Sequence, residues 1–104
     1  MEEIDIQNQI RLALNDIAIM FDTSIGAVIK RGDMFIRTGL VKGHSDLTGV
    51  RRSDGKAIFI EVKKPKGSVI YKEQKNFLKQ MKKANAITGI CRSPEEAIEL
   101  VNNG

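Results

Sequence analysis

One segment, Ile58 to Lys64, constrains the fold most, because it alternates apolar and charged residues as a half-buried strand does. With side chains alternating between the two faces of a strand, its branched apolar residues share one face, and Phe59, Glu61 and Lys63 share the other. A buried charge without a partner costs several kcal/mol, roughly, so buried charges are paired or bind metals. We therefore interpret Glu61 and Lys63 as part of a functional site.

The residues before this strand predict its antiparallel partner. An Asp-Gly step, Asp54-Gly55, favours a two-residue hairpin turn between two strand-like runs. A turn of that length pairs Thr48 with Glu61 and Asp46 with Lys63, and makes Asp46 and Glu61 diagonal neighbours on one face. Diagonal pairs lie roughly 7 to 8 Å apart, so two short carboxylates could converge there on one hard cation. A three-residue turn would instead send Asp46 to the opposite face.

Charge is distributed unevenly along the chain, which has a net charge of +4. Between Met1 and Asp22 there are five acids and one arginine, whereas eight lysines and one glutamate lie between Lys63 and Lys83. A basic surface beside paired carboxylates is what a phosphodiester substrate requires. The alternative is that these lysines form only a solvated helix face.

The remaining pattern predicts one small domain with helices around a sheet. The expected elements are a helix over Ile4–Phe21, a hairpin over Ser24–Ile36, a helix over Tyr71–Ala84, a strand over Ile87–Cys91 and a helix from Ser93 through Val101. Glu3 and Gln7 lie one turn apart near the start of the first helix and share a face. Glu3 either looks toward the strand site or favours the helix N-terminus through its dipole.

Between the hairpin and the central strands lies a loop rich in glycine and polar residues. Lys42, His44 and Ser45 precede Asp46 in this loop and are candidates to contact a phosphate backbone. His44 is the only histidine, and it is either a general acid, a phosphate contact or a solvated loop side chain.

Composition excludes several other classes of protein. No apolar run is long enough to span a membrane and no signal peptide is visible, so we expect an intracellular setting, the cytoplasm of a bacterial host or prokaryotic cell, with a nuclear one still open. The single cysteine, Cys91, excludes an internal disulfide and a zinc site built from cysteines.

The constellation of Asp46, then fourteen residues, then Glu61-x-Lys63, resembles the core of PD-(D/E)XK nucleases. The chain also resembles the VRR-NUC family, the virus-type replication-repair nuclease branch of that superfamily. Four ordered motifs carry this resemblance: E-x-x-I-Q at Glu3 to Gln7, K-G-x-S-D at Lys42 to Asp46, E-V-K-x-P at Glu61 to Pro65, and E-Q-x-x-F-L at Glu73 to Leu78. Tyr71 departs from the family pattern, which has serine or threonine there.

The resemblance implies an α/β (α+β) fold with a restriction-endonuclease-like core, a mixed central sheet flanked by helices, in the order αβββαβα. It also implies phosphodiester hydrolysis that depends on Mg²⁺ or Mn²⁺, with Asp46, Glu61 and the Val62 carbonyl as metal ligands, helped by Glu3. Lys63 would orient the attacking water and Gln74 would fix a phosphate or water. The expected DNA contacts are Gln7, Lys42, His44, Ser45, Lys64, Lys66, Lys72 and Lys75.

Stand-alone members of this size are similar to homodimeric resolvases of four-way DNA junctions, so we expect a homodimer that acts on branched DNA, without a membrane partner. Three alternatives stay open. The fold could bind nucleic acid or another protein without catalysis, it could act as a flap or nicking repair nuclease, or it could cut one defined duplex sequence. The last has no room for a separate recognition module.

Overall fold

The computed structural model describes residues 2–24, 28–31, 34–37 and 40–104, and gives only the strand pairing for 28–31 and 34–37. None of the helices in these ranges is long and apolar enough to cross a membrane. The elements are α1 (Glu3–Leu14), β1 (Ala18–Asp22), β2 (Val28–Arg31), β3 (Met34–Arg37), β4 (Leu47–Arg51), β5 (Ala57–Val62), α2 (Lys72–Lys83), β6 (Ile87–Cys91) and α3 (Pro94–Asn103).

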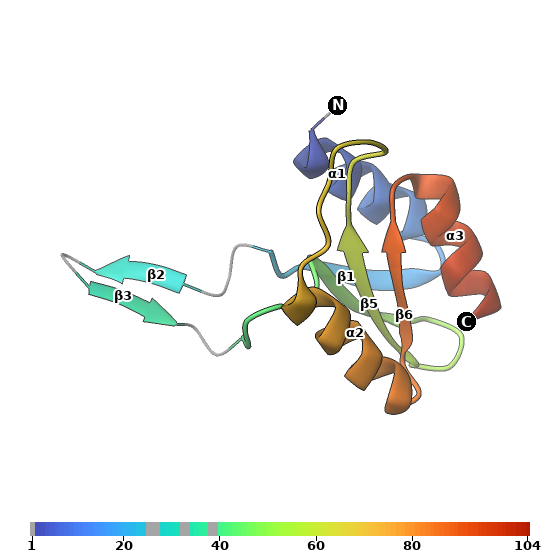
Figure 1. Cartoon of the computed structure of the whole chain (residues 1–104). Coiled ribbons are helices and arrows are strands. Elements are labelled where there is room, and N and C mark those ends of the chain that lie inside the picture. Colours follow the sequence, from blue (N-terminus) through green and yellow to red (C-terminus); the bar gives the residue numbers. More distant parts are fainter. Residues whose placement is uncertain (1, 25–27, 32–33, 38–39) are drawn as a thin grey trace.

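A four-stranded mixed sheet in the order β1-β4-β5-β6 forms the centre of the molecule. β4 is antiparallel to β1 and β5, whereas β6 is parallel to β5. α1 and α3 pack together on one side of this sheet and α2 lies on the other (Figure 1). Along the chain, the helices and the strands of this sheet follow the order αβββαβα, with the hairpin β2–β3 inserted between β1 and β4. This order confirms the predicted fold class. The hairpin β2–β3 is a second, two-stranded sheet that projects to one side (Figure 1).

The hydrophobic core lies between the sheet and the α1–α3 pair. Its members are the inward side chains of both helices and of one sheet face: Ile6, Ile10, Leu14, Ala18, Leu47, Ile58, Ile60, Val62, Ile87, Cys91, Ala97 and Val101. Side chains alternate along a strand, so the residues between these core positions on β5 face α2 instead. Phe59 and Glu61 are among them, and that face carries the candidate site.

The predicted first helix, Ile4–Phe21, is wrong in its second half. α1 ends at Leu14, and Ala18–Asp22 form β1, which pairs with β4 at the edge of the sheet. Apolar residues here satisfy both a helical and an alternating pattern, and the backbone hydrogen bonds of β4 decide between them. Asn15 and Asp16, both weak helix formers, mark the change.

The predicted two-residue turn at Asp54-Gly55 is also wrong. Leu47 pairs with Ile60 and Thr48 pairs with Phe59, so the register is shifted by two residues from the expected one. The loop is longer because Gly55 N–H donates to the Arg51 carbonyl, and a bidentate ion pair joins Arg51 to Asp54. A shift of two preserves the face of every side chain, and one further step of this register places Asp46 opposite Glu61.

The other predicted elements are confirmed with small changes in their bounds. The hairpin is present as β2 and β3, while residues 25–27 and its turn at 32–33 lie outside the described residues. α2, β6 and α3 follow the predicted helix, strand and helix closely, and Ser93 Oγ accepts the Glu96 N–H at the start of α3.

Candidate functional site

Two acids and a lysine meet at the end of β5 that is nearest to the loop before β4. Asp46 is the last residue of that loop, Glu61 is the next-to-last residue of β5, and Lys63 follows the strand directly. The Val62 N–H donates to Asp46 Oδ2 at 2.8 Å, which holds the aspartate against β5. The structure therefore brings together the three residues of the predicted core.

Glu61 is almost fully buried, with 2% of its surface exposed. Its Oε1 accepts a hydrogen bond from Gln74 Nε2 at 2.9 Å and lies 3.9 Å from Lys63 Nζ. Among the described residues, Oε2 has no hydrogen-bond partner and is the sole buried side-chain atom of this kind. The pKa of Glu61 is raised to about 9, mainly because the group is buried and next because the carboxyl of Asp46 is close. The positive charge of Lys63 lowers this pKa, but by less.

This environment fits a divalent cation. A buried carboxylate oxygen without a donor, next to a second carboxylate, is satisfied by a proton or by a metal ion. In the described part of the chain, no three His, Cys, Asp or Glu side chains gather into a metal cluster. Asp46 and Glu61 would therefore need backbone and water oxygens as further ligands, which is the way Mg²⁺ is usually held in proteins.

Gln74, in the first turn of α2, is held in one orientation. Its Oε1 accepts the Tyr71 N–H at 3.0 Å, which turns Nε2 toward Glu61. The ring of Tyr71 lies near the site as well, with its centroid 5.9 Å from Lys63 Nζ. Gln74 thus contacts a candidate metal ligand, whereas the sequence assigned it to a phosphate or water.

Glu3 reaches the site from α1 through a serine that the sequence analysis missed. Glu3 Oε2 accepts from Ser68 Oγ at 3.3 Å, and Ser68 Oγ accepts the Lys64 N–H at 2.9 Å. Arg92 holds the same loop through the Lys64 carbonyl. The charge of Glu3 also contributes to the raised pKa of Glu61, so the two carboxyls interact. A hydroxyl directly after Pro65-Lys66-Gly67, a segment typical of a tight loop, was the available signal for Ser68.

The loop before Asp46 packs directly on α2. Gly43 has a φ of +88°, and a Cβ built there would lie 2.5 Å from the Glu73 carbonyl oxygen. Lys42 Nζ lies 3.8 Å from Glu73 Oε1, and both side chains are largely exposed. Ser45 is fully buried, and its hydroxyl donates to the Leu47 carbonyl. Ser45 therefore supports the shape of the loop, while Lys42 offers a charge at the surface.

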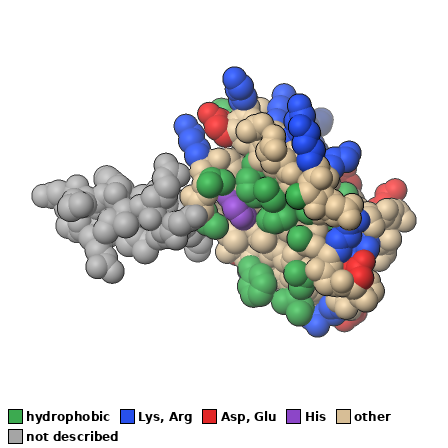
Figure 2. Space-filling model, turned by 90° about the horizontal axis from the view of Figure 1, so that it is seen from below, with side chains coloured by type: hydrophobic (Ala, Val, Ile, Leu, Met, Phe, Trp, Pro, Cys, Tyr) green, Lys and Arg blue, Asp and Glu red, His purple; other side chains and the backbone are tan. Residues whose placement is uncertain are grey.

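His44 is half-buried among aromatic rings. Its ring centroid lies 4.5 Å from that of Phe77 and 6.0 Å from that of Phe59, and Nδ1 lies 3.0 Å from the Ser45 carbonyl oxygen. Hydrophobic side chains surround the histidine on the face shown in Figure 2. This packing stabilises the contact between the loop and α2.

Gln7 shares a helix face with Glu3 but is buried, with 6% of its surface exposed. Its Oε1 accepts from Ser24 Oγ at 3.5 Å, a long hydrogen bond that joins α1 to the segment after β1. The burial of Gln7 does not fit its predicted role as a DNA contact.

Most of the other predicted DNA contacts are exposed lysines. Lys66, Lys72 and Lys75 are exposed, and Lys64 Nζ lies 3.9 Å from Glu2 Oε2. A hollow of about 440 Å³ along α2 is lined by Lys72, Glu73, Lys75, Asn76 and Lys79. Basic side chains lie along this edge of the molecule in Figure 2.

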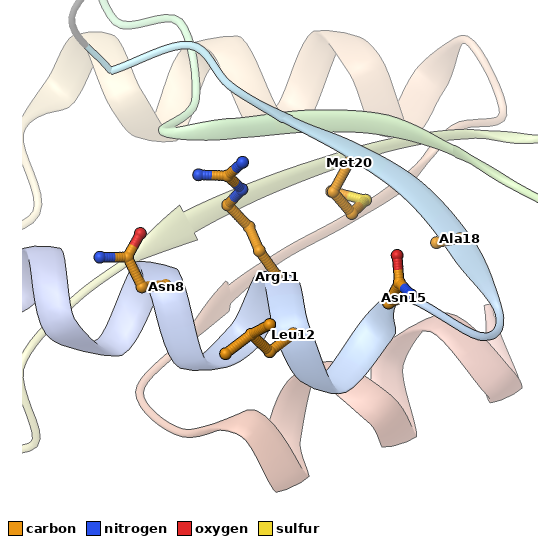
Figure 3. A pocket seen from close by; sticks show the side chains of 6 residues that line it. All are labelled: Asn8, Arg11, Leu12, Asn15, Ala18 and Met20. Atoms are coloured by element: carbon orange, nitrogen blue, oxygen red, sulfur yellow. The ribbon is translucent and has the colours of Figure 1, made fainter.

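A cleft of about 740 Å³ opens beside Asp46. Its lining comes from the segment after β1, the loop before β4 and the start of α2: Thr23, Ser24, Val41, Lys42, Gly43, His44, Asp46, Tyr71, Glu73 and Gln74. A separate hollow of about 380 Å³ lies between α1 and β1, where the Arg11 side chain extends from the helix toward the sheet (Figure 3). None of the described residues that line that second hollow is acidic, whereas the larger cleft includes Asp46, so we take the cleft as the candidate substrate site.

A mixed sheet that carries an aspartate and a Glu-x-Lys strand end on its α2 face defines a nuclease core of the PD-(D/E)XK type. The chain belongs to the VRR-NUC family, since the model of the VRR-NUC domain matches residues 20–95. The match begins within β1, so Glu3 and Gln7 on α1 lie outside it. A search among curated proteins finds no match to the chain. Membership of this family implies a nuclease that acts on DNA.

Proposed function

We propose that the protein is a DNA endonuclease that depends on Mg²⁺ or Mn²⁺ and selects branched structures. The observation that carries the metal dependence is the buried Glu61 Oε2, which lacks a donor among the described residues and lies in a carboxyl group next to that of Asp46. Asp46, Glu61 and the Val62 carbonyl would hold the cation, with Glu3 within electrostatic reach. When bound, the cation supplies Lewis-acid activation and lowers the pKa of water.

Each neighbouring side chain has a distinct role in this proposal. Lys63, which is 5% exposed, orients the attacking water and stabilises negative charge that develops on the phosphate. Gln74 holds the Glu61 carboxylate in place through its 2.9 Å hydrogen bond. Gly43 and His44 fix the loop against α2, so that Asp46 stays opposite Glu61.

The lysines of α2 and of the loop after β5 supply the DNA contacts in this proposal. Lys64, Lys66, Lys72 and Lys75 are charges that can replace the counterions of the phosphates, which makes binding weaker at higher salt. Lys42 lines the cleft beside Asp46 and would contact the same DNA strand as these lysines.

The proposal includes a homodimer that resolves four-way junctions, because such a substrate needs two cuts and one chain offers a single site. Apolar side chains on the part of the sheet that α2 leaves uncovered support a subunit contact: Ile19, Phe21 and Val50 are 42%, 58% and 38% exposed. Ile19 and Val50 are cross-strand partners, so they form one patch. A flap or nicking nuclease that acts as a monomer is the alternative.

The test is cleavage of linear, flap, fork and four-way junction DNA with Mn²⁺, with the protein sized in solution. Wild type should cut branched DNA, while Asp46→Asn and Lys63→Ala should bind it without cutting. Glu99→Gln, which neutralises an exposed carboxylate on α3, is the matched control and should cut normally. DNA binding by wild type without cleavage of any substrate would show a binding module instead.

A further inference from the structure

The cleft beside Asp46 is lined mostly by polar residues, yet it also carries exposed apolar surface. Two of its lining side chains, Tyr71 and Val41, are 60% and 59% exposed. Lysine and polar groups are sufficient to hold phosphates, so they do not explain an exposed aromatic ring. Leaving apolar surface in water costs free energy that a ligand could recover by covering it.

Tyr71 is held in place by its backbone. It is the residue that precedes α2, and its N–H donates to Gln74 Oε1 at 3.0 Å. Its ring centroid lies 5.9 Å from Lys63 Nζ, so the ring lies within a few ångströms of the group proposed to orient water. An exposed ring can cover the face of a planar ligand, and because the backbone of Tyr71 is already fixed, only its side-chain torsions remain to be ordered on binding.

We propose that Tyr71 stacks on an unpaired nucleobase next to the scissile phosphate, while Val41 contacts that nucleotide across the cleft. This inference rests on the proposed nuclease function and names what the enzyme selects. In a paired duplex each base is covered on both faces by its neighbours, so its ring face is not accessible to Tyr71. A base freed at a flap, a fork or a junction crossover exposes that face, and every base has one, so stacking selects structure without reading sequence.

The binding test uses DNA with a single 2-aminopurine at the unpaired position, in an Asp46→Asn background that keeps the DNA intact. Tyr71 should quench the fluorescence of the probe on binding, and Tyr71→Phe should quench it equally. Tyr71→Ala should bind roughly 5- to 150-fold more weakly, the range that base–aromatic stacking gives. Tyr71→Leu keeps apolar bulk without a ring and should behave like alanine.

Three outcomes of this test would overturn the inference. Equal binding by Tyr71→Leu and wild type would mean that the contact is apolar and not stacking. Equal binding by Tyr71→Ala and wild type would mean that the ring contributes nothing. An equal loss in Ile98→Ala, which removes an exposed apolar side chain on α3 that does not line the cleft, would mean that the effect is not specific to Tyr71.

The cleavage test separates this inference from the proposed function. In the otherwise wild-type protein, Tyr71→Ala should lower the rate ratio of flap DNA to fully paired nicked duplex by a similar factor, whereas Tyr71→Phe should preserve it. If wild type cuts no DNA, the proposed function fails and the fluorescence result still decides the role of Tyr71. If wild type cuts and the ratio is unchanged in Tyr71→Ala, only the inference about Tyr71 fails.

Discussion

The Val62 N–H donates to Asp46 Oδ2, at 2.8 Å, where the β4–β5 ladder would otherwise continue through backbone atoms. Extending the register by two residues from the Leu47–Ile60 pair would place Ser45 opposite Val62. The Ser45 carbonyl instead accepts from Thr23 Oγ1 at 2.8 Å. A side-chain carboxylate therefore takes the place of a backbone acceptor, and this substitution brings Asp46 to Glu61.

Gln74→Ala should lower Mn²⁺-dependent cleavage by roughly 10- to 100-fold, the usual cost of removing a group that orients a metal ligand. The physical reason is that Glu61 Oε1 loses its 2.9 Å donor and Tyr71 N–H loses its acceptor. Single-turnover cleavage rates measure the effect. Gln80→Ala, on the exposed side of the same helix, should leave the rate unchanged, and an equal loss there would indicate damage to α2 as a whole.

The metal-free protein should lose stability as pH rises from about 5 to 9. Burial and Asp46 raise the pKa of Glu61 to about 9 in the folded chain, from its ordinary value of 4.5. Folding therefore favours the protonated form, and this contribution is complete below the unfolded pKa and is lost as pH rises through the folded one.

Urea denaturation in EDTA at pH 5, 7 and 9 measures this dependence. Glu61→Gln carries no titrating proton, so its free energy of unfolding should fall less across this range than that of wild type. Parallel pH profiles for the two proteins would mean that Glu61 titrates normally in the fold.

Gly43→Ala should lower the free energy of unfolding more than Gly55→Ala does. Both glycines have positive φ, +88° and +73°, so each substitution carries a backbone cost of about 1–3 kcal/mol. Only at Gly43 would the added Cβ meet backbone, 2.5 Å from the Glu73 carbonyl oxygen, since nothing lies within 4 Å of a Cβ at Gly55. Denaturation midpoints of the two variants compare the costs, and equal losses would mean that the loop does not press against α2.

The fold was predictable where one pattern excluded the others. The strand at Ile87–Cys91 and the helix after Ser93 have unambiguous alternation and capping signals, and both are confirmed. Ile17 to Phe21 fit two periods, and only pairing with β4, which is distant in sequence, selects a strand. The prediction of the turn after Arg51 was wrong for a related reason. The ion pair between the side chains of Arg51 and Asp54 stabilises a longer loop, and the sequence pattern did not indicate it.

The sequence was sufficient to predict which residues form the centre of the site, but not which residues they contact. The parity of the strands was sufficient to place Asp46, Glu61 and Lys63 on one face, even with the register shifted by two. Burial depends on the packing of the loop against α2, which a sequence pattern does not show. For that reason Ser45 was expected at the DNA surface and is buried. Gln7 is buried and Ser68 was missed because their contacts, with Ser24 and with Glu3, join segments that are distant in the sequence.

The central claim is that Asp46 and Glu61 share one divalent cation. A crystal structure of the protein soaked with Mn²⁺, with anomalous differences recorded at the manganese edge, tests it most directly. We predict one peak within roughly 2.0 to 2.6 Å of an oxygen from each of the two carboxyls. Manganese bound elsewhere, or no peak between these residues in crystals of an active preparation, would contradict the account.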